Sequence, residues 1–305
     1  MRFRIPHFIL ALLLSPAAFA GVGDTGGDPS EPALSEMAEA DPAEAGIERL
    51  SMLELGMGIG SALTPDYPGS NQSRVRAIPF PYGAYRGKIL YSDKRGGARA
   101  RLLTATTYEV SVSGGGGFPV SSSENDARRG MPDLDWMGQV GPRLQFRLID
   151  FEKGGSLRVG FPVRAVVTAS SLTNFVHRGW VYAPEMIADW PNVFGDDTSA
   201  YVLVNTVFAD QKFRDYIYSV KPEHATSERP AYEAKGGYML SDMTLGASYA
   251  FAGGRHKLVG ALTTAYLGGA ANESGPLMKS RWNVSGGLIW IYTFYFSEKK
   301  VTVDD

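Results

Sequence analysis

The feature that most constrains the fold is a two-residue alternation of large apolar residues with small or charged ones, which recurs from residue 51 to residue 296. In the first segment, Glu54 and glycines stand between large apolar residues, at Leu53, Leu55, Met57 and Ile59. This period places successive side chains on opposite faces of a β-strand. Clusters of Gly, Pro, Asn, Asp and Ser separate the segments, as is typical of turns. The chain is therefore predicted to be all-β.

The length of the segments favours a membrane barrel over a soluble sandwich. Several segments run for about ten to fourteen residues, whereas globular strands average about five or six and a membrane-crossing strand needs about 9–11. Aromatic residues gather at the segment ends, among them Tyr82, Trp180, Tyr182, Tyr266 and Trp282. Because a sheet in lipid cannot leave an edge unpaired, we predict a closed antiparallel transmembrane β-barrel. We expect about 12 strands, with 10 or 14 as neighbouring even numbers. Residues 88–92 and 98–103 fit either one bent strand or a short hairpin.

The N-terminal residues have the pattern of a targeting signal. Arg2 and Arg4 precede an apolar run, and Ala18-Phe19-Ala20 provides a small-x-small cleavage site. We therefore expect a signal peptide over residues 1–20, cleaved near Ala20, an acidic flexible periplasmic tail over 21–50, an outer-membrane barrel over 51–296 and a short C-terminal tail over 297–305. Residues 21–48 hold eight carboxylates and no Lys or Arg. This composition predicts either a solvated spacer or a segment that attracts a basic partner by its negative charge.

Composition excludes several classes of site. The chain has no Cys, four His and a formal net charge of −2. The lack of Cys rules out disulfides, a thiol nucleophile and Cys-based metal sites. The nearly neutral net charge gives no broad basic surface for binding nucleic acid. Side chains suited to acyl transfer do occur in one predicted loop, at Ser170, Ser171, Asn174 and His177, but their spacing does not aim a base at a nucleophile. We expect a polar hairpin loop there, no catalytic residue, no cofactor and no metal.

Charged residues on the small-residue face of the segments predict a lumen. They are Glu54, Glu109, Arg143, Arg147, Arg158, Arg164, Glu233 and Lys235. Charges on a barrel wall must face water or one another, so two alternatives remain open: a lumen plugged by ion pairs that cross it, or a narrow hydrated pore. On the opposite face of the last long segment, four aromatic residues are predicted to face lipid and to support assembly: Trp282, Trp290, Phe294 and Phe296.

Residues 53–87 carry a distinctive N-terminal block. It combines the glycine-alternating first strand with a turn, formed by Pro65, Asp66, Tyr67, Pro68, Gly69 and Ser70, and with the strand 78–82. This block resembles the signature of the MipA/OmpV family of Gram-negative outer-membrane proteins, and residues 216–237 resemble a later loop of that family. The turn chemistry of residues 65–70 predicts a rigid hairpin cap, with an exposed recognition surface presenting Tyr67 as the alternative. In contrast to the family pattern, nine residues follow Phe296.

The resemblance implies an outer-membrane location and no enzymatic activity. It further implies a scaffold that bridges a murein-cleaving lytic transglycosylase and a murein-synthesising penicillin-binding protein, with outer-membrane lipid and lipopolysaccharide as surroundings. A narrow, porin-like diffusion channel for small solutes is the alternative.

Overall fold

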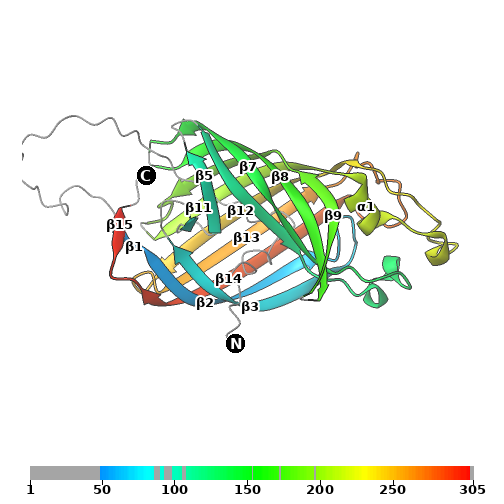
Figure 1. The fold of residues 1–305 in the computed structure, drawn as a ribbon, viewed down its shortest axis with the longest axis horizontal. Coiled ribbons are helices and arrows are strands. Elements are labelled where there is room, and N and C mark those ends of the chain that lie inside the picture. Colours follow the sequence, from blue (N-terminus) through cyan, green and yellow to red (C-terminus); the bar gives the residue numbers. More distant parts are fainter. Residues whose placement is uncertain are drawn as a thin grey trace, which may run out of the picture.

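The computed structural model describes residues 49–85, 90–92, 98–104, 108–152, 154–171, 173–195 and 197–302. The predicted signal peptide and residues 21–48 of the predicted tail lie outside these ranges. Long antiparallel strands dominate the described chain (Figure 1). The main sheet contains β2 (Leu53–Pro65), β3 (Ser73–Tyr85), β4 (Leu90–Ser92), β5 (Ala98–Thr104), β6 (Tyr108–Gly117), β7 (Trp136–Asp150), β8 (Ser156–Ser171), β9 (Asn174–Tyr182), β10 (Glu185–Pro191), β11 (Thr198–Ala209), β12 (Gly237–Phe251), β13 (His256–Tyr266) and β14 (Trp282–Phe296).

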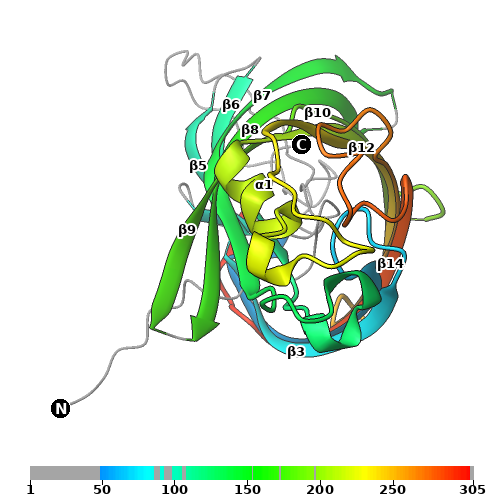
Figure 2. The same cartoon turned by 90° about the vertical axis from the view of Figure 1, so that its right-hand side faces the viewer.

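Twelve of these strands follow one hydrogen-bonded order, β3-β2-β14-β13-β12-β11-β10-β8-β7-β6-β5-β4. The remaining strand, β9, lies in line with β10, because both pair with β8 and with β11. The two ends of the order, β3 and β4, contact each other, and Figure 2 shows the sheet curling into a barrel. The predicted all-β antiparallel architecture is confirmed, and the described residues of the two doubtful segments, 90–92 and 98–103, lie on two paired short strands rather than one bent strand.

The two faces of the sheet have the polarity of a membrane barrel. On β2, the outward side chains of Met57 and Ile59 are exposed, whereas the alternating Gly56, Gly58 and Gly60 are buried. On β14, the outward Trp282, Leu288 and Trp290 are likewise exposed. In a soluble sandwich the large apolar face would be the buried one. The outer wall is therefore apolar, and the interior is lined mainly by small and polar residues, with a few buried apolar side chains such as Ile187, Leu203 and Ile289.

Connections differ sharply between the two ends of the barrel. At one end, β7, β10 and β12 are joined to the next strand by the short turns 151–155, 192–197 and 252–255. The short strands β1 (Arg49–Ser51) and β15 (Lys300–Thr302) pair with each other near this end, which we call the terminal end (Figure 1). At the opposite end, long loops connect the strands at residues 66–72, 118–135, 210–236 and 267–281. We call these four loops together the cap.

The cap has its own apolar core and closes over the barrel mouth. Its buried members include Tyr67, Val120, Phe213, Tyr218 and Leu277, each from one of the four loops. Figure 2 shows helix α1 (Gln211–Tyr218) lying across the opening. The cap also contains the short 3-10 helices η1 (Ser122–Glu124), η2 (Asp126–Arg128) and η3 (Pro222–His224).

Local sequence explains why α1 forms there. The side chain of Asp210 accepts a hydrogen bond from the backbone N–H of Phe213 at 2.9 Å, which satisfies one of the free donors of the first turn. Phe213 and Ile217 are four residues apart, so they share one face of the helix, and both are buried in the cap core. Among the described residues, no helix is both long and apolar enough to cross a membrane.

Candidate functional site

The turn at residues 65–70, which we call the signature loop, lies at the centre of the cap. The hydroxyl of Tyr67 donates to the backbone oxygen of Leu277 at 2.9 Å, and the hydroxyl of Tyr218 donates to the oxygen of Pro68 at 2.7 Å. The backbone N–H of Gly69 donates to Oδ1 of Asn283 at 2.6 Å. The signature loop is thus bonded to α1, to the loop 267–281 and to β14.

Two residues of the signature loop show why its sequence is so restricted. Gly69 has a φ of 88°, at which any other residue is strained, and a Cβ there would also lie 2.2 Å from the sulfur of Met278, which would have to move. Tyr67 is 3% exposed, and burial raises its pKa to about 12, although the nearby Arg128 opposes this shift. The expected rigid hairpin cap is therefore what the structure contains, and the alternative of an exposed surface presenting Tyr67 is wrong.

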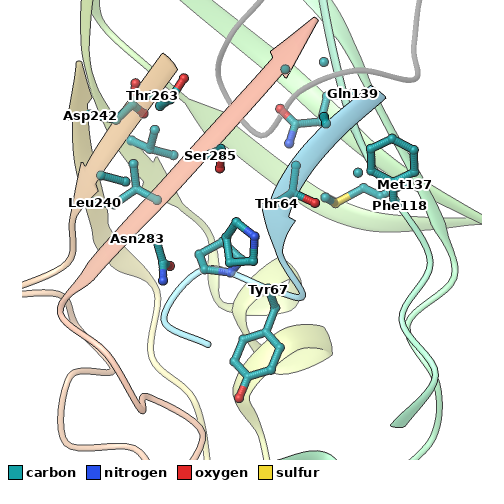
Figure 3. A pocket seen from close by; sticks show the side chains of 18 of the residues that line it. Thr64, Tyr67, Phe118, Met137, Gln139, Leu240, Asp242, Thr263, Asn283 and Ser285 are labelled. Atoms are coloured by element: carbon teal, nitrogen blue, oxygen red, sulfur yellow. The ribbon is translucent and has the colours of Figure 1, made fainter. Parts of the chain in front are cut away.

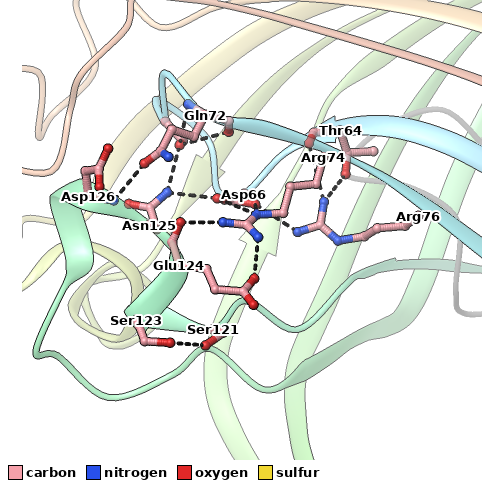
Figure 4. A network of polar contacts seen from close by, with 11 residues as sticks. Thr64, Asp66, Gln72, Arg74, Arg76, Ser121, Ser123, Glu124, Asn125 and Asp126 are labelled. Carbon is pink, nitrogen blue, oxygen red and sulfur yellow. Dashed lines mark hydrogen bonds and ion pairs between the residues drawn. The ribbon is translucent and has the colours of Figure 1, made fainter.

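Asp66 ties the signature loop to the loop 118–135 through a buried ionic network (Figure 4). Its carboxylate accepts hydrogen bonds from Nε of Arg74 at 3.1 Å, from a terminal nitrogen of Arg76 at 3.0 Å and from Nδ2 of Asn125 at 2.9 Å. Arg74 also forms an ion pair with Glu124. One carboxylate that is fully buried thereby joins the β2–β3 hairpin to η1 and η2.

Two further arginines hold the cap loops together. Arg128, 2% exposed, donates to the backbone oxygen of Ile217 in α1 at 2.8 Å, and Arg229 donates to the oxygens of Ala127 and Arg129 at 2.9 Å and 3.0 Å. Burial lowers the pKa of Arg128. Sequence analysis missed both residues, since isolated arginines in polar loops usually face solvent.

The lumen charges pair sideways along one part of the wall. Arg143 on β7 forms an ion pair with Glu185 on β10 at 3.1 Å, and Arg164 on β8 lies 3.8 Å from the same carboxylate. Arg158 on β8 pairs with Asp189 on β10. These partners stand on adjacent or next-adjacent strands, so the expected pairing across the lumen is wrong for them. The glycine at position 160 leaves room for the ion pair between Arg143 and Glu185, because a Cβ there would lie 2.9 Å from Oε1 of Glu185.

The other predicted lumen charges are distributed differently. Glu109 is buried on the inward face of β6. Glu54 lies at the start of β2, where the hydroxyl of Tyr82 donates to it at 3.4 Å, and Arg147 pairs with Asp150 at the terminal end at 2.9 Å. Among the predicted positions, Glu233 and Lys235 are exposed in the cap loop rather than on the wall.

The placement of Glu233 and Lys235 corrects the prediction that both residues belong to a strand of the barrel wall. β12 begins only at Gly237. Before it, the side chain of Asn272 takes the hydrogen bonds that a neighbouring strand would otherwise make: it accepts from the backbone N–H of Lys235 at 2.7 Å and donates to the oxygen of Lys235 at 2.9 Å. The alternation there reflects one buried loop residue, Ala234, and not a strand.

Aromatic side chains on the outer wall form two belts. At the cap end, Tyr266 and Trp282 have ring centroids 4.7 Å apart. At the terminal end, the ring of His256 stacks against Trp290 at 5.7 Å and against Tyr292 at 5.0 Å. Such belts mark the two interfaces of a membrane barrel. They bracket an apolar band on the same wall.

Phe296 departs from its predicted place in the terminal-end belt. Trp282, Trp290 and Phe294 are exposed on the outer wall, as expected. A β-bulge between Thr293 and Tyr295 then shifts the register by one residue, so that Phe296 is paired with Glu54 on the inward side. The Phe296 ring is half-buried, with the Arg255 guanidinium 5.8 Å from its centre. The prediction that Phe296 faces lipid is therefore wrong.

Beneath the cap lies a cavity with a water-accessible volume of about 170 Å³ (Figure 3). Figure 3 shows Asp242 and Thr263 on neighbouring strands at one side of the cavity, with Gln139 and Phe118 at the other. Glu185 and Asn205 also line it. Sequence analysis missed Glu185, Asn205 and Asp242 as lumen residues, although the alternation in their segments contains the signal that places them inward.

No catalytic constellation is assembled in the described part of the chain. In the β8–β9 hairpin, Asn174 donates to the hydroxyl of Ser170 at 2.8 Å, while Nδ1 of His177 lies 3.4 Å from the Lys212 ammonium. Within the described ranges, no three His, Cys, Asp or Glu side chains are grouped closely enough to hold a metal ion.

Comparisons with known proteins identify one family. A family model described as MltA-interacting protein MipA matches residues 57–294. Three solved Pseudomonas aeruginosa structures are each 9% identical to this chain. The alignment with OpdO covers 80% of this chain and 98% of OpdO, with a TM-score of 0.24, and the alignment with OpdL covers 82% of this chain and 99% of OpdL, also with a TM-score of 0.24. The alignment with a FadL homologue covers 81% of this chain and 91% of the homologue, with a TM-score of 0.22. No curated protein matches the chain. With TM-scores this low, it is the family match that identifies the chain.

Proposed function

Because this chain belongs to the MltA-interacting protein family, we propose that it is a non-enzymatic scaffold of the outer membrane. In this role its terminal end binds a murein-cleaving lytic transglycosylase and, with it, a murein-synthesising penicillin-binding protein. Family membership, the apolar outer wall and the two aromatic belts support an outer-membrane β-barrel.

The closed cap is the observation that carries the proposal. Its four loops share a buried core and are joined by the hydrogen bonds of the signature loop. On the wall beneath the cap, Arg143 pairs sideways with Glu185 and Arg158 with Asp189. A barrel with its mouth closed in this way is better suited to holding a partner than to passing solutes.

The sidedness of the loops indicates where a partner would bind. Membrane barrels carry short turns on the periplasmic side and longer loops outside. By this rule the terminal end faces the periplasm and the murein. On the turn 192–197 of that end, Phe194 is 88% exposed, and Val193 beside it is also exposed. An apolar side chain so exposed at this position fits a contact with a partner.

A second candidate, a narrow diffusion channel, is favoured by the cavity beneath the cap. It requires the cap to open, since α1 and the signature loop lie between the cavity and the outside. Conductance in planar bilayers separates the two candidates. Steady single-channel steps from the intact protein would favour the channel.

The scaffold is tested by co-purification of the full chain with a lytic transglycosylase and a penicillin-binding protein. We expect Phe194→Ser to reduce this co-purification several-fold. Phe175→Ser is the matched control, because Phe175 is exposed on the β8–β9 hairpin at the opposite end of the barrel. Equal losses from both variants, or no murein enzyme bound to the parent protein, would refute the terminal end as the binding surface.

The acidic tail is tested in the same assay. Deletion of residues 21–48 removes eight carboxylates. If these residues attract a basic patch, the deletion lowers co-purification at low salt and has little effect at high salt, where exposed charges are screened over about 3 Å at 1 M. Full retention of the partners by the shortened chain at both salt concentrations would identify the tail as a spacer only.

A further inference from the structure

A row of polar side chains lines the lumen at the level of the cavity. The strand register pairs Glu185 on β10 with Asn205 on β11, and Asn205 with Asp242 on β12. Residues directly opposite each other on antiparallel strands point to the same face, so these three side chains are inward neighbours. All three are buried, and all three line the cavity.

Asp242 differs from the other buried carboxylates of this wall. It is 4% exposed, and within the described structure its hydrogen-bonding neighbour is the side chain of Asn205, which does not reach either carboxylate oxygen in ordinary hydrogen-bond geometry. The amide oxygen of Asn205 beside it also has no donor there. Three acceptor atoms on two adjacent strands, each almost inaccessible to water, thus belong to residues that line one cavity. A buried acceptor without a donor is costly, and a buried carboxylate more so.

The positive charges nearby are already engaged by other groups. Arg143 is paired with Glu185 at 3.1 Å. Arg164 lies 3.8 Å from Glu185 and donates from Nε to the hydroxyl of Ser113 at 3.1 Å. Arg164 also acts on Asp242 at longer range, whereas Glu185 repels it. Asp242 therefore lacks a cation of its own.

Opposite this polar row, the cavity offers apolar surface. Phe118 and Met137 line it on that side, and Val259 and Ile289 add apolar surface on β13 and β14, next to the strand of Asp242. A ligand that bonds to the acceptors of Asp242 and Asn205 and also packs against the apolar lining needs a positively charged group with several donors and a compact apolar body. An ammonium group has three donors, which matches the two oxygens of Asp242 and the amide oxygen of Asn205.

We propose that the cavity beneath the cap is a binding site for a small primary amine, held by Asp242 and Asn205 through its ammonium group. This site is independent of the scaffold role, which concerns the terminal end. A divalent metal is a poorer occupant, because the described residues contain no group of three acidic or His ligands. A neutral or anionic ligand would leave the Asp242 charge uncompensated.

The test is calorimetric titration of the full chain, purified in detergent, with three probes of similar size: phenethylammonium, phenethyl alcohol and phenylacetate. We expect phenethylammonium to bind at least about tenfold more tightly than the alcohol, since a hydrogen bond to a charged group is the stronger kind. Phenylacetate is expected not to bind. Equal binding of the amine and the alcohol would overturn the proposal.

Variants assign the site. Asp242→Asn keeps the side-chain size and removes the charge, and it is expected to lower phenethylammonium affinity at least about tenfold. Asn205→Ala should weaken binding less, because it removes a neutral acceptor. Glu223→Gln is the matched control, since this carboxylate lies exposed in η3, outside the cavity. Heat-modifiable electrophoretic migration checks that each variant is folded. Unchanged affinity in a folded Asp242→Asn protein would refute the assignment.

Discussion

Replacing Asp66 by Asn should loosen the cap without unfolding the barrel. The buried carboxylate joins Arg74, Arg76 and Asn125, and its loss leaves two arginines without their shared counter-charge. Removing one partner of a buried ion pair costs about 3–5 kcal/mol. The arginine side chains are 33% and 14% exposed, so water compensates part of the loss. We therefore expect about 3 kcal/mol, the lower end of that range.

Hydrogen exchange measures this change directly. The amide of Ser70, bonded to the oxygen of Tyr67 at 2.9 Å, exchanges only when the signature loop opens. A loss of about 3 kcal/mol corresponds to roughly a hundredfold faster exchange. Asp126→Asn is the control, because its ion pair with Arg129 is largely exposed and is worth about 0–1 kcal/mol. Exchange in Asp66→Asn within twofold of the parent, or equal acceleration in both variants, would show that the network does not hold the cap.

Three further predictions concern the cap and the wall. Burial raises the pKa of Tyr67 to about 12, against 10.0 for an unperturbed tyrosine, so Tyr67 ionises at lower pH in the unfolded state than in the folded one. The buried hydroxyl therefore stabilises the cap fully below about pH 10, and this stabilisation is lost as the pH rises to about 12. Protease sensitivity of the cap across this range should show the loss in the parent and less of it in Tyr67→Phe. Arg214 is buried in α1 with no acceptor for its guanidinium in the described structure, so Arg214→Met should raise the melting temperature; a lower value would contradict this. Phe294→Asp, on the lipid face, should reduce outer-membrane levels of the protein, whereas Phe296→Asp, on the inward side, should reduce them much less; equal levels of the two variants in fractionated membranes would count against the bulge.

The inward and outward faces of the barrel wall were predictable, because the sequence of each strand alternates between residues of one face and residues of the other. The alternation at Leu53 to Ile59 is enough to identify the outward side of β2, and the same rule places Arg143 and Arg158 inward. The sideways ion pairs were not predictable, because they depend on which strands are neighbours and on their register. Glu185 could be found on the correct face, but not matched to Arg143 two strands away.

The cap was the least predictable part, since no period governs loop packing. Arg128 meets the oxygen of Ile217 only because two loops distant in sequence fold together. The β14 bulge was also hidden: one extra residue between Thr293 and Tyr295 changes the side on which Phe296 lies, and nothing in the aromatic run 290–296 indicates where the extra residue falls.

The hydrogen bonds of the signature loop join residues that are far apart in sequence, and this separation determines when the loop can fold. Tyr67 bonds to a residue 210 positions later, Gly69 to one 214 positions later and Pro68 to one 150 positions later. The loop emerges early in synthesis, yet its partners Leu277 and Asn283 are made only near the end of the barrel sequence. Contacts so distant in sequence form late, after the intervening chain has been ordered. Burial of Tyr67 thus reports that the barrel is nearly complete, and a chain halted before the loop 267–281 leaves Tyr67 open to proteases and chaperones.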